Sequence, residues 1–166
     1  HGNIDAGGVL IGAGETSYTL VLNDLHSGER TFFTARGAGA QFDVDDVDLD
    51  RLPAKIFHAG YVLLLDSLDG EDPEYGTRMA SLLAKARGRG MRTSIDVVSE
   101  SGGRFSRLVP PAMKYADYCI INEYEAQQVT GVPLRDASGG LLAESIPEAL
   151  RKMKGFGVSS WAVIHC

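Results

Sequence analysis

Short apolar segments alternate with amphipathic ones from about residue 52 onward, and this alternation restricts the fold more than any other feature of the sequence. The apolar segments predict strands at residues 56–65, 91–97, 117–121 and 161–165. The segments between them predict helices over 73–87, over 105–114 with internal prolines, over 126–131, and after Ser145, where Glu148 and a first-turn proline suggest a capping box. Strands that alternate with helices are typical of a parallel sheet built from βαβ units. The sequence therefore predicts an α/β fold.

Residues up to about 42 follow a different pattern. They are rich in Thr, Val, Phe and Tyr, with glycines between short runs, which favours strands over helices. Residues 16–23 alternate and can pair with residues 30–35 through a turn at 24–29, which predicts a β-hairpin.

Composition excludes several classes of function. Lys and Arg number 16 against 22 Asp and Glu and are dispersed, which argues against nucleic acid. The longest apolar runs, such as residues 61–65, are far too short to span a bilayer. The two cysteines, Cys119 and Cys166, have neither metal-site spacing nor a disulfide framework, and the four histidines are scattered. We expect a cytoplasmic protein that binds neither nucleic acid nor membrane.

Two polar residues follow the apolar segment 117–121. Asn122 and Glu125 lie three residues apart at the expected start of a helix that Gly131 ends. This spacing fits an ordinary capping box, which needs no ligand. It also fits an amide and a carboxylate that orient hydrated magnesium and phosphate beside the exposed N–H groups of the helix. Spacing alone leaves both interpretations open.

The segment ADYCIINEYEAQQVTG, residues 116–131, resembles the N-x-x-E signature of the ribokinase-like sugar kinases, also called the PfkB family. Residues 14–42 are similar to the lid region of that family, residues 56–66 to the strand after it, and residues 93–100 to the next strand. The resemblance implies a ribokinase-like three-layer αβα sandwich, with a Rossmann-like parallel sheet and a small β-strand lid.

Two segments of that family have no counterpart here. One is the amino-terminal Gly-Gly segment that contacts the sugar, and the other is the carboxyl-terminal GAGD segment, which supplies the anion hole and the catalytic base. We therefore expect an incomplete fold, with residues 1–42 as part of the lid and its connections and residues 43–166 as the central part of the kinase domain. The resemblance places no catalytic base in this chain, which should be inactive alone.

The resemblance implies ATP-dependent phosphorylation of a sugar hydroxyl by the complete protein, with ATP and Mg²⁺ as cofactors. Asn122 and Glu125 would organise magnesium and phosphate, Glu125 through water. The lids of this family often pair between subunits, so the resemblance also implies a homodimer through the lid, with Phe32 and Phe33 as interface candidates.

Five other residues are further site candidates. Thr34 and Arg36 would point the same way from the lid and are candidates for sugar contact. Thr34 stands where some relatives have tyrosine, which argues against an acidic sugar. Asp96 matches the strand-end aspartate of the family, although it can equally bond local backbone N–H groups. Arg104 and Arg107 can face phosphate or be solvated.

Three alternatives come from other classes. A nucleoside kinase of the same fold would share every motif, and a non-catalytic sugar- or nucleotide-binding module could use the same scaffold. A Rossmann-type dehydrogenase is disfavoured because Gly12-Ala13-Gly14 lacks the third glycine and a helix start. The sequence does not identify the acceptor.

Overall fold

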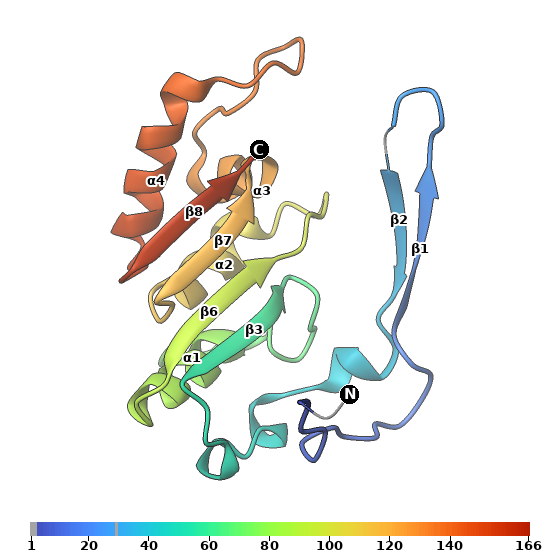
Figure 1. Cartoon of the computed structure of the whole chain (residues 1–166), viewed down its shortest axis with the longest axis vertical. Helices are drawn as coiled ribbons and strands as arrows, with labels where there is room; N and C mark the ends of the chain where they lie inside the picture. The colour runs from blue at the N-terminus through green and yellow to red at the C-terminus, as the bar shows by residue number, and fades with distance from the viewer. Residues whose placement is uncertain (1–2, 29) are drawn as a thin grey trace.

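The computed structural model describes residues 3–28 and 30–166. Its centre is a four-stranded parallel sheet with the strand order β3-β6-β7-β8 (Figure 1). The strands are β3 (Ile56–Val62), β6 (Arg92–Val97), β7 (Tyr118–Asn122) and β8 (Trp161–His165). The predicted parallel α/β sheet is confirmed. Strand β3 is shorter than predicted because Leu63 has a φ of 76°, which turns the chain out of the extended conformation.

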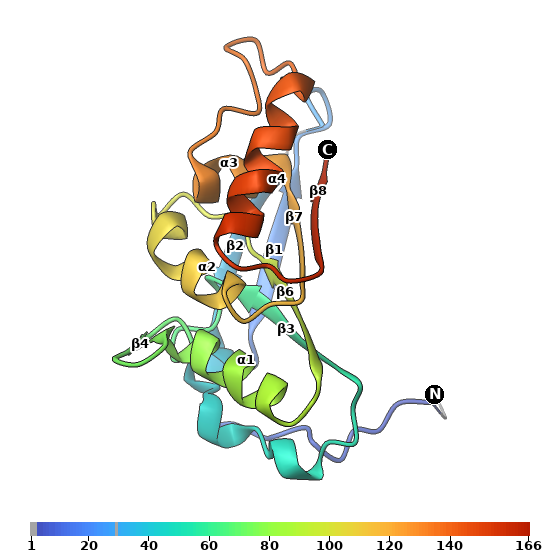
Figure 2. The same ribbon diagram turned by 90° about the vertical axis from the view of Figure 1, so that its left-hand side faces the viewer.

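All the α-helices lie on one face of this sheet (Figure 2). They are α1 (Arg78–Gly88), α2 (Phe105–Met113), α3 (Glu123–Thr130) and α4 (Ile146–Gly155). Right-handed crossovers explain this arrangement, because the strand order advances in one direction and each helix then falls on the same side. The described residues thus form two layers of the expected three-layer sandwich. Among them, no helix is both long and apolar enough to cross a bilayer.

The helix predicted over residues 73–87 begins later than expected. Residues before it form a small hairpin of β4 (Glu71–Asp72) and β5 (Gly76–Thr77). The Asp72 carboxylate accepts hydrogen bonds from the N–H groups of Glu74 and Tyr75 at 2.9 and 2.8 Å, which stabilises a turn in place of helix. Thr77 then caps α1 by accepting a bond from the Ala80 N–H at 3.1 Å.

The predicted capping box at Ser145 is wrong. The Ser145 side chain makes no capping hydrogen bond, because the 3₁₀ turn η4 (Ala143–Ser145) already leads the backbone into α4 in a helical conformation. The proline in the first turn of this helix is present as predicted.

Alternate strand residues face the helices and form the core. Thr93, Ile95 and Val97 of β6 and Cys119 and Ile121 of β7 are buried. On the opposite face, Ile120 is 46% exposed and Trp161 is 68% exposed. Parallel sheets are normally buried on both faces. The described residues therefore cover one face of the sheet and leave apolar side chains open on the other.

An antiparallel hairpin of β1 (Tyr18–Asn23) and β2 (Arg30–Ala35) stands apart from the sheet (Figure 1). This confirms the predicted pairing of these strands. The predicted turn at 24–29 includes residue 29, which lies outside the described residues. The hairpin connects to β3 through three 3₁₀ turns, η1 (Gly37–Gln41), η2 (Val44–Asp46) and η3 (Leu49–Arg51).

Candidate functional site

Four polar side chains gather where β6 and β7 end. Asp96 lies near the end of β6, Ser99 follows in the next loop, and Asn122 and Glu125 lie at the junction of β7 and α3. In open α/β sheets, ligands bind beyond the carboxyl ends of the strands. We call Asp96, Ser99, Asn122 and Glu125 the strand-end group.

The capping box predicted for Asn122 and Glu125 is present. The Asn122 Oδ1 accepts a hydrogen bond from the Glu125 N–H at 2.8 Å, and the Glu125 Oε2 accepts one from the Asn122 N–H at 2.9 Å. Gly131 ends the helix with a left-handed φ of 69°. The local interpretation of the spacing is therefore correct, and it also fixes the amide and the carboxylate at the sheet edge.

Ser99 adds a contact that the local pattern does not contain. Its hydroxyl donates a hydrogen bond to the Glu125 Oε1 at 2.6 Å and accepts one from the Asn122 Nδ2 at 3.1 Å. Both Glu125 oxygens thus have protein donors, and the loop after β6 is tied to the start of α3. Sequence reasoning missed Ser99 because no local signal marks it.

Glu125 is a buried carboxylate, with only 4% of its surface exposed. Burial raises the pKa of Glu125, and the negative charge of Asp96 also raises it, while the hydrogen bonds from Ser99 and Asn122 act in the opposite direction. Asp96 itself accepts a bond from the Val97 N–H at 2.8 Å, as in the local interpretation of this residue. A cation beside the strand-end group would stabilise the charged forms of both carboxylates.

The donor set fits magnesium only through its water ligands. The part of the chain that the structure describes contains no cluster of three His, Cys, Asp or Glu side chains that could hold a metal directly. Glu125 is nearly buried and already hydrogen-bonded at both oxygens. Magnesium usually keeps several waters, and carboxylate and amide oxygens can accept hydrogen bonds from those waters.

Thr34 and Arg36 lie together in a second place, below the hairpin. They line a cavity of about 220 Å³ with Ser17, Thr19, Leu64 and Leu65. The Thr34 and Thr19 hydroxyls are 3.0 Å apart. Arg36 forms an ion pair with Asp66, in the loop after β3. The cavity is therefore lined by hydroxyls, apolar groups and one arginine that is already paired.

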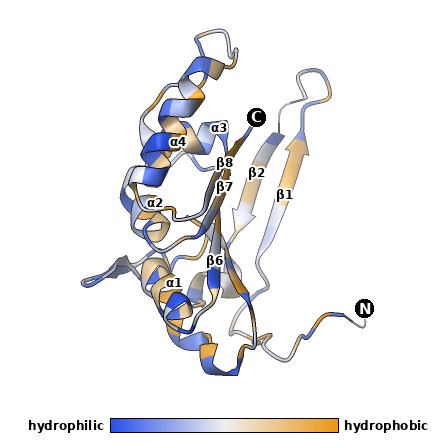
Figure 3. Ribbon diagram, turned by 60° about the vertical axis from the view of Figure 1, so that its left-hand side comes forward, coloured by the Kyte–Doolittle hydropathy of each residue, from blue (hydrophilic) through white to orange (hydrophobic). Residues whose placement is uncertain are grey.

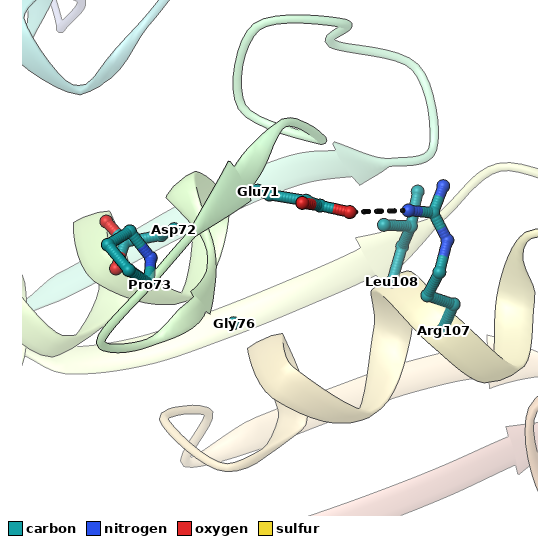
Figure 4. Close-up of a pocket in the computed structure, with 6 residues that line it drawn as sticks. All are labelled: Glu71, Asp72, Pro73, Gly76, Arg107 and Leu108. Atoms are coloured by element: carbon teal, nitrogen blue, oxygen red, sulfur yellow. Dashed lines mark hydrogen bonds and ion pairs between the residues drawn. The ribbon is translucent and has the colours of Figure 1, made fainter.

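Arg104 and Arg107 differ in their surroundings. Arg107 is exposed and pairs with Glu71 at 3.3 Å, beside a cavity of about 260 Å³ between the β4–β5 hairpin and α2 (Figure 4). That cavity has no lining residue from the strand-end group. Arg104 is partly buried and makes several bonds to protein acceptors. The phosphate-facing role considered for these two arginines has no support from their contacts.

Asp117 is a buried aspartate to which sequence reasoning assigned no role. It precedes β7 and accepts hydrogen bonds from the Thr93 N–H at 2.9 Å, the Ser159 hydroxyl at 2.6 Å and the Arg92 guanidinium at 3.1 Å. Burial raises the pKa of Asp117, but these hydrogen bonds together lower it below its ordinary value. The residue joins β6, β7 and the segment before β8, which is a structural role.

Neither a protein-family model nor a curated protein matches the sequence. Solved structures do match the fold. Fructokinase from Xylella fastidiosa has a TM-score of 0.55 and 22% identity over 88% of this chain and 42% of that chain. Ribokinase from Arabidopsis thaliana, complexed with ribose and ATP, has a TM-score of 0.53 and 15% identity over 87% of this chain and 41% of that chain. 2-Dehydro-3-deoxygluconokinase from Thermotoga maritima has a TM-score of 0.53 and 20% identity over 75% of this chain and 39% of that chain. The chain spans less than half the length of these structures.

Proposed function

We propose, from the ribokinase-like fold that the chain shares with these kinases, that the whole protein is an ATP-dependent kinase acting on a hydroxyl group of an uncharged sugar. The observation that carries the proposal is the strand-end group, in which Ser99 and a capping box hold Glu125 and Asn122 at the carboxyl edge of the sheet. In this proposal residues 1–42 belong to the lid and its connections, and residues 43–166 are the central part of the kinase domain.

The chain would contribute positioning and electrostatics to phosphoryl transfer. Asn122 and Glu125 would hold the waters of magnesium, and Asp96 would add a second negative charge beside them. Magnesium, when bound, neutralises charge on the phosphates. By the family resemblance, the base and the anion hole would come from a GAGD segment, which has no counterpart in residues 1–166. The cavity below the hairpin would receive the sugar, and the lid above it would exclude water.

The direct test is ATP turnover by the whole protein against neutral sugars, sugar acids and nucleosides. Magnesium-dependent phosphorylation of a neutral sugar would support the proposal. Preferred phosphorylation of a nucleoside would assign the alternative kinase class. Binding of sugar without hydrolysis or transfer of phosphate would identify a non-catalytic module and would overturn the kinase proposal.

The Arg36–Asp66 ion pair supports an uncharged acceptor, because it neutralises the only charged residue that lines the cavity among the described residues. Asp66→Asn should release Arg36 and lower the KM for sugar acids roughly tenfold relative to neutral sugars, the effect of one added charge-assisted hydrogen bond. Adding Arg36→Gln to this variant should restore the original preference. The ratio of kcat/KM for the two classes measures this effect, and an unchanged ratio in Asp66→Asn would contradict it.

The hairpin supports a homodimer formed through the lid. Tyr18, Leu20, Leu22 and Phe33 share one face of the hairpin and are each more than half exposed, and hydrophobic residues are visible on both strands (Figure 3). An isolated two-stranded hairpin is only marginally stable in water. A second copy of the chain would cover this apolar face and stabilise the hairpin.

The dimer is tested by charging one face of the hairpin at a time. Leu20→Asp should convert a dimeric whole protein to monomer, because it places an unpaired carboxylate in the proposed interface. Val21→Asp lies on the opposite face of the same strand and is the matched control. Sedimentation equilibrium measures the mass of each variant. A monomeric wild-type protein, or equal dissociation by both substitutions, would exclude this interface.

The two cysteines are free in the structure, with Cys119 buried and Cys166 exposed. Burial raises the pKa of the Cys119 thiol to about 12, so this thiol stays protonated at neutral pH. Unpaired thiols fit a reducing compartment and support the proposed location in the cytoplasm.

A further inference from the structure

We infer that Arg104 is a positioning residue that joins the loops after β3 and β6 and so holds Ser99 against Glu125. The inference rests on the proposed function, because it concerns the strand-end group. In this inference Arg104 acts by holding other protein residues in place. The sequence alone had left open that Arg104 faces phosphate directly.

Every guanidinium nitrogen of Arg104 already donates to a protein acceptor, and the bond from Nη1 is the longest of them. Its side chain is 27% exposed, and it lies immediately before α2. Nε and Nη2 donate to the two carboxylate oxygens of Glu100 at 3.0 and 2.6 Å. Nη2 also donates to the Leu63 carbonyl at 2.9 Å, and Nη1 donates to Asp69 at 3.4 Å. Arginine suits this work because its planar fork binds several acceptors at once.

One side of this contact fixes the loop after β3. Leu63 is fully buried and has a positive φ, a conformation that costs a bulky residue energy and persists only where its surroundings enforce it. The Leu63 N–H donates to the Asp69 carboxylate at 2.9 Å, while its carbonyl accepts from Arg104. Both polar groups of the turning residue are thus held by the Asp69–Arg104 pair. The same loop carries Asp66, the partner of Arg36.

The other side fixes the loop after β6. Glu100 directly follows Ser99, and its carboxylate binds Arg104. The Glu100 carbonyl accepts a hydrogen bond from the Tyr124 hydroxyl at 3.0 Å, and Tyr124 lies next to Glu125 on α3. Glu100 is therefore held through its side chain, by Arg104, and through its backbone carbonyl, by Tyr124. Without Arg104, the Glu100 carboxylate would lose its cation, and the bond from Tyr124 would be left to hold the Glu100 backbone, so Ser99 would be held less firmly against Glu125.

The first test is a double-mutant cycle in the whole protein. Arg104→Gln should raise the magnesium concentration for half-maximal turnover up to about tenfold, the lower end of the effect of losing a residue that supports a metal site. In a Ser99→Ala background the same substitution should have little further effect, because it acts through Ser99. Arg107 lies three residues after Arg104, in α2. Arg107→Gln is therefore the matched control and should leave the magnesium requirement unchanged.

Two further measurements separate positioning from general stability. Arg104→Lys keeps the charge without the fork and should give an intermediate magnesium requirement. Hydrogen exchange of the protein without magnesium or ATP should be faster in residues 63–69 and 98–103 of Arg104→Gln, with the strands of the sheet unaffected. Additive effects in the cycle, or faster exchange throughout the sheet, would overturn the inference. Absence of turnover in the wild type would refute the proposed function instead, and the exchange measurement alone would then decide whether Arg104 joins the loops.

Discussion

Replacing Glu125 by glutamine in the whole protein is expected to lower phosphoryl transfer about 10- to 100-fold and to raise the magnesium requirement, with sugar binding nearly unchanged. Glutamine can still accept the hydrogen bond from the Asn122 N–H, so the helix start is kept. What is lost is the negative charge that attracts the cation and its waters. The measurements are kcat, the KM of the sugar and the magnesium dependence of turnover.

The melting temperature of the same variant distinguishes lost chemistry from lost structure. Glu125→Gln removes a charge that is nearly buried, so the protein without magnesium should melt at the same temperature or higher. Glu123→Gln is the matched control, because Glu123 begins the same helix and pairs with Arg135, away from the strand-end group. An unchanged magnesium dependence in Glu125→Gln would contradict the role of Glu125 in holding magnesium through its waters. An equal loss of turnover in Glu123→Gln would contradict it as well.

The same group shows what sequence can and cannot predict. The capping box of Asn122 and Glu125 was predictable because both partners lie within one turn of helix and their bonds depend on local backbone geometry. The contact with Ser99 spans 26 residues and forms only when β6 and β7 pair in the sheet. Residue spacing along the chain does not predict that these two strands pair.

Two other differences have different physical origins, one long-range and one local. The hairpin of β1 and β2 was predictable from alternation, but the ion pair of Arg36 with Asp66 joins residues 30 positions apart and depends on how the hairpin sits over the loop after β3. The helix expected from residue 73 failed for a local reason, since Asp72 bonds the following N–H groups and competes with helix. Side-chain competition of this kind shifts boundaries without changing the type or order of the elements.

Asp117 has the largest expected effect on stability. Asp117→Ala should lower the free energy of unfolding of the whole protein by about 3 kcal/mol, because it leaves the buried Thr93 N–H unsatisfied and removes the acceptor of Ser159 and Arg92. That is a large share of the 5–15 kcal/mol typical of folded proteins. Asp117→Asn keeps one acceptor for the Thr93 N–H and should cost less. Urea unfolding measures both variants, and Asp45→Asn, at an exposed aspartate, is the control.

The pH dependence of stability tests separately whether the charged form of Asp117 stabilises the folded protein. The pKa of Asp117 is lower in the folded protein than its ordinary value, so the folded state favours the charged form. The stabilisation is therefore complete above the unfolded pKa, near 3.9, and is lost as the pH falls through the folded pKa. Wild type and Asp117→Asn should differ most at neutral pH and converge below about pH 4. A difference that is constant from pH 7 to pH 3 would show that packing, and not the charged hydrogen bonds, makes Asp117 stabilising.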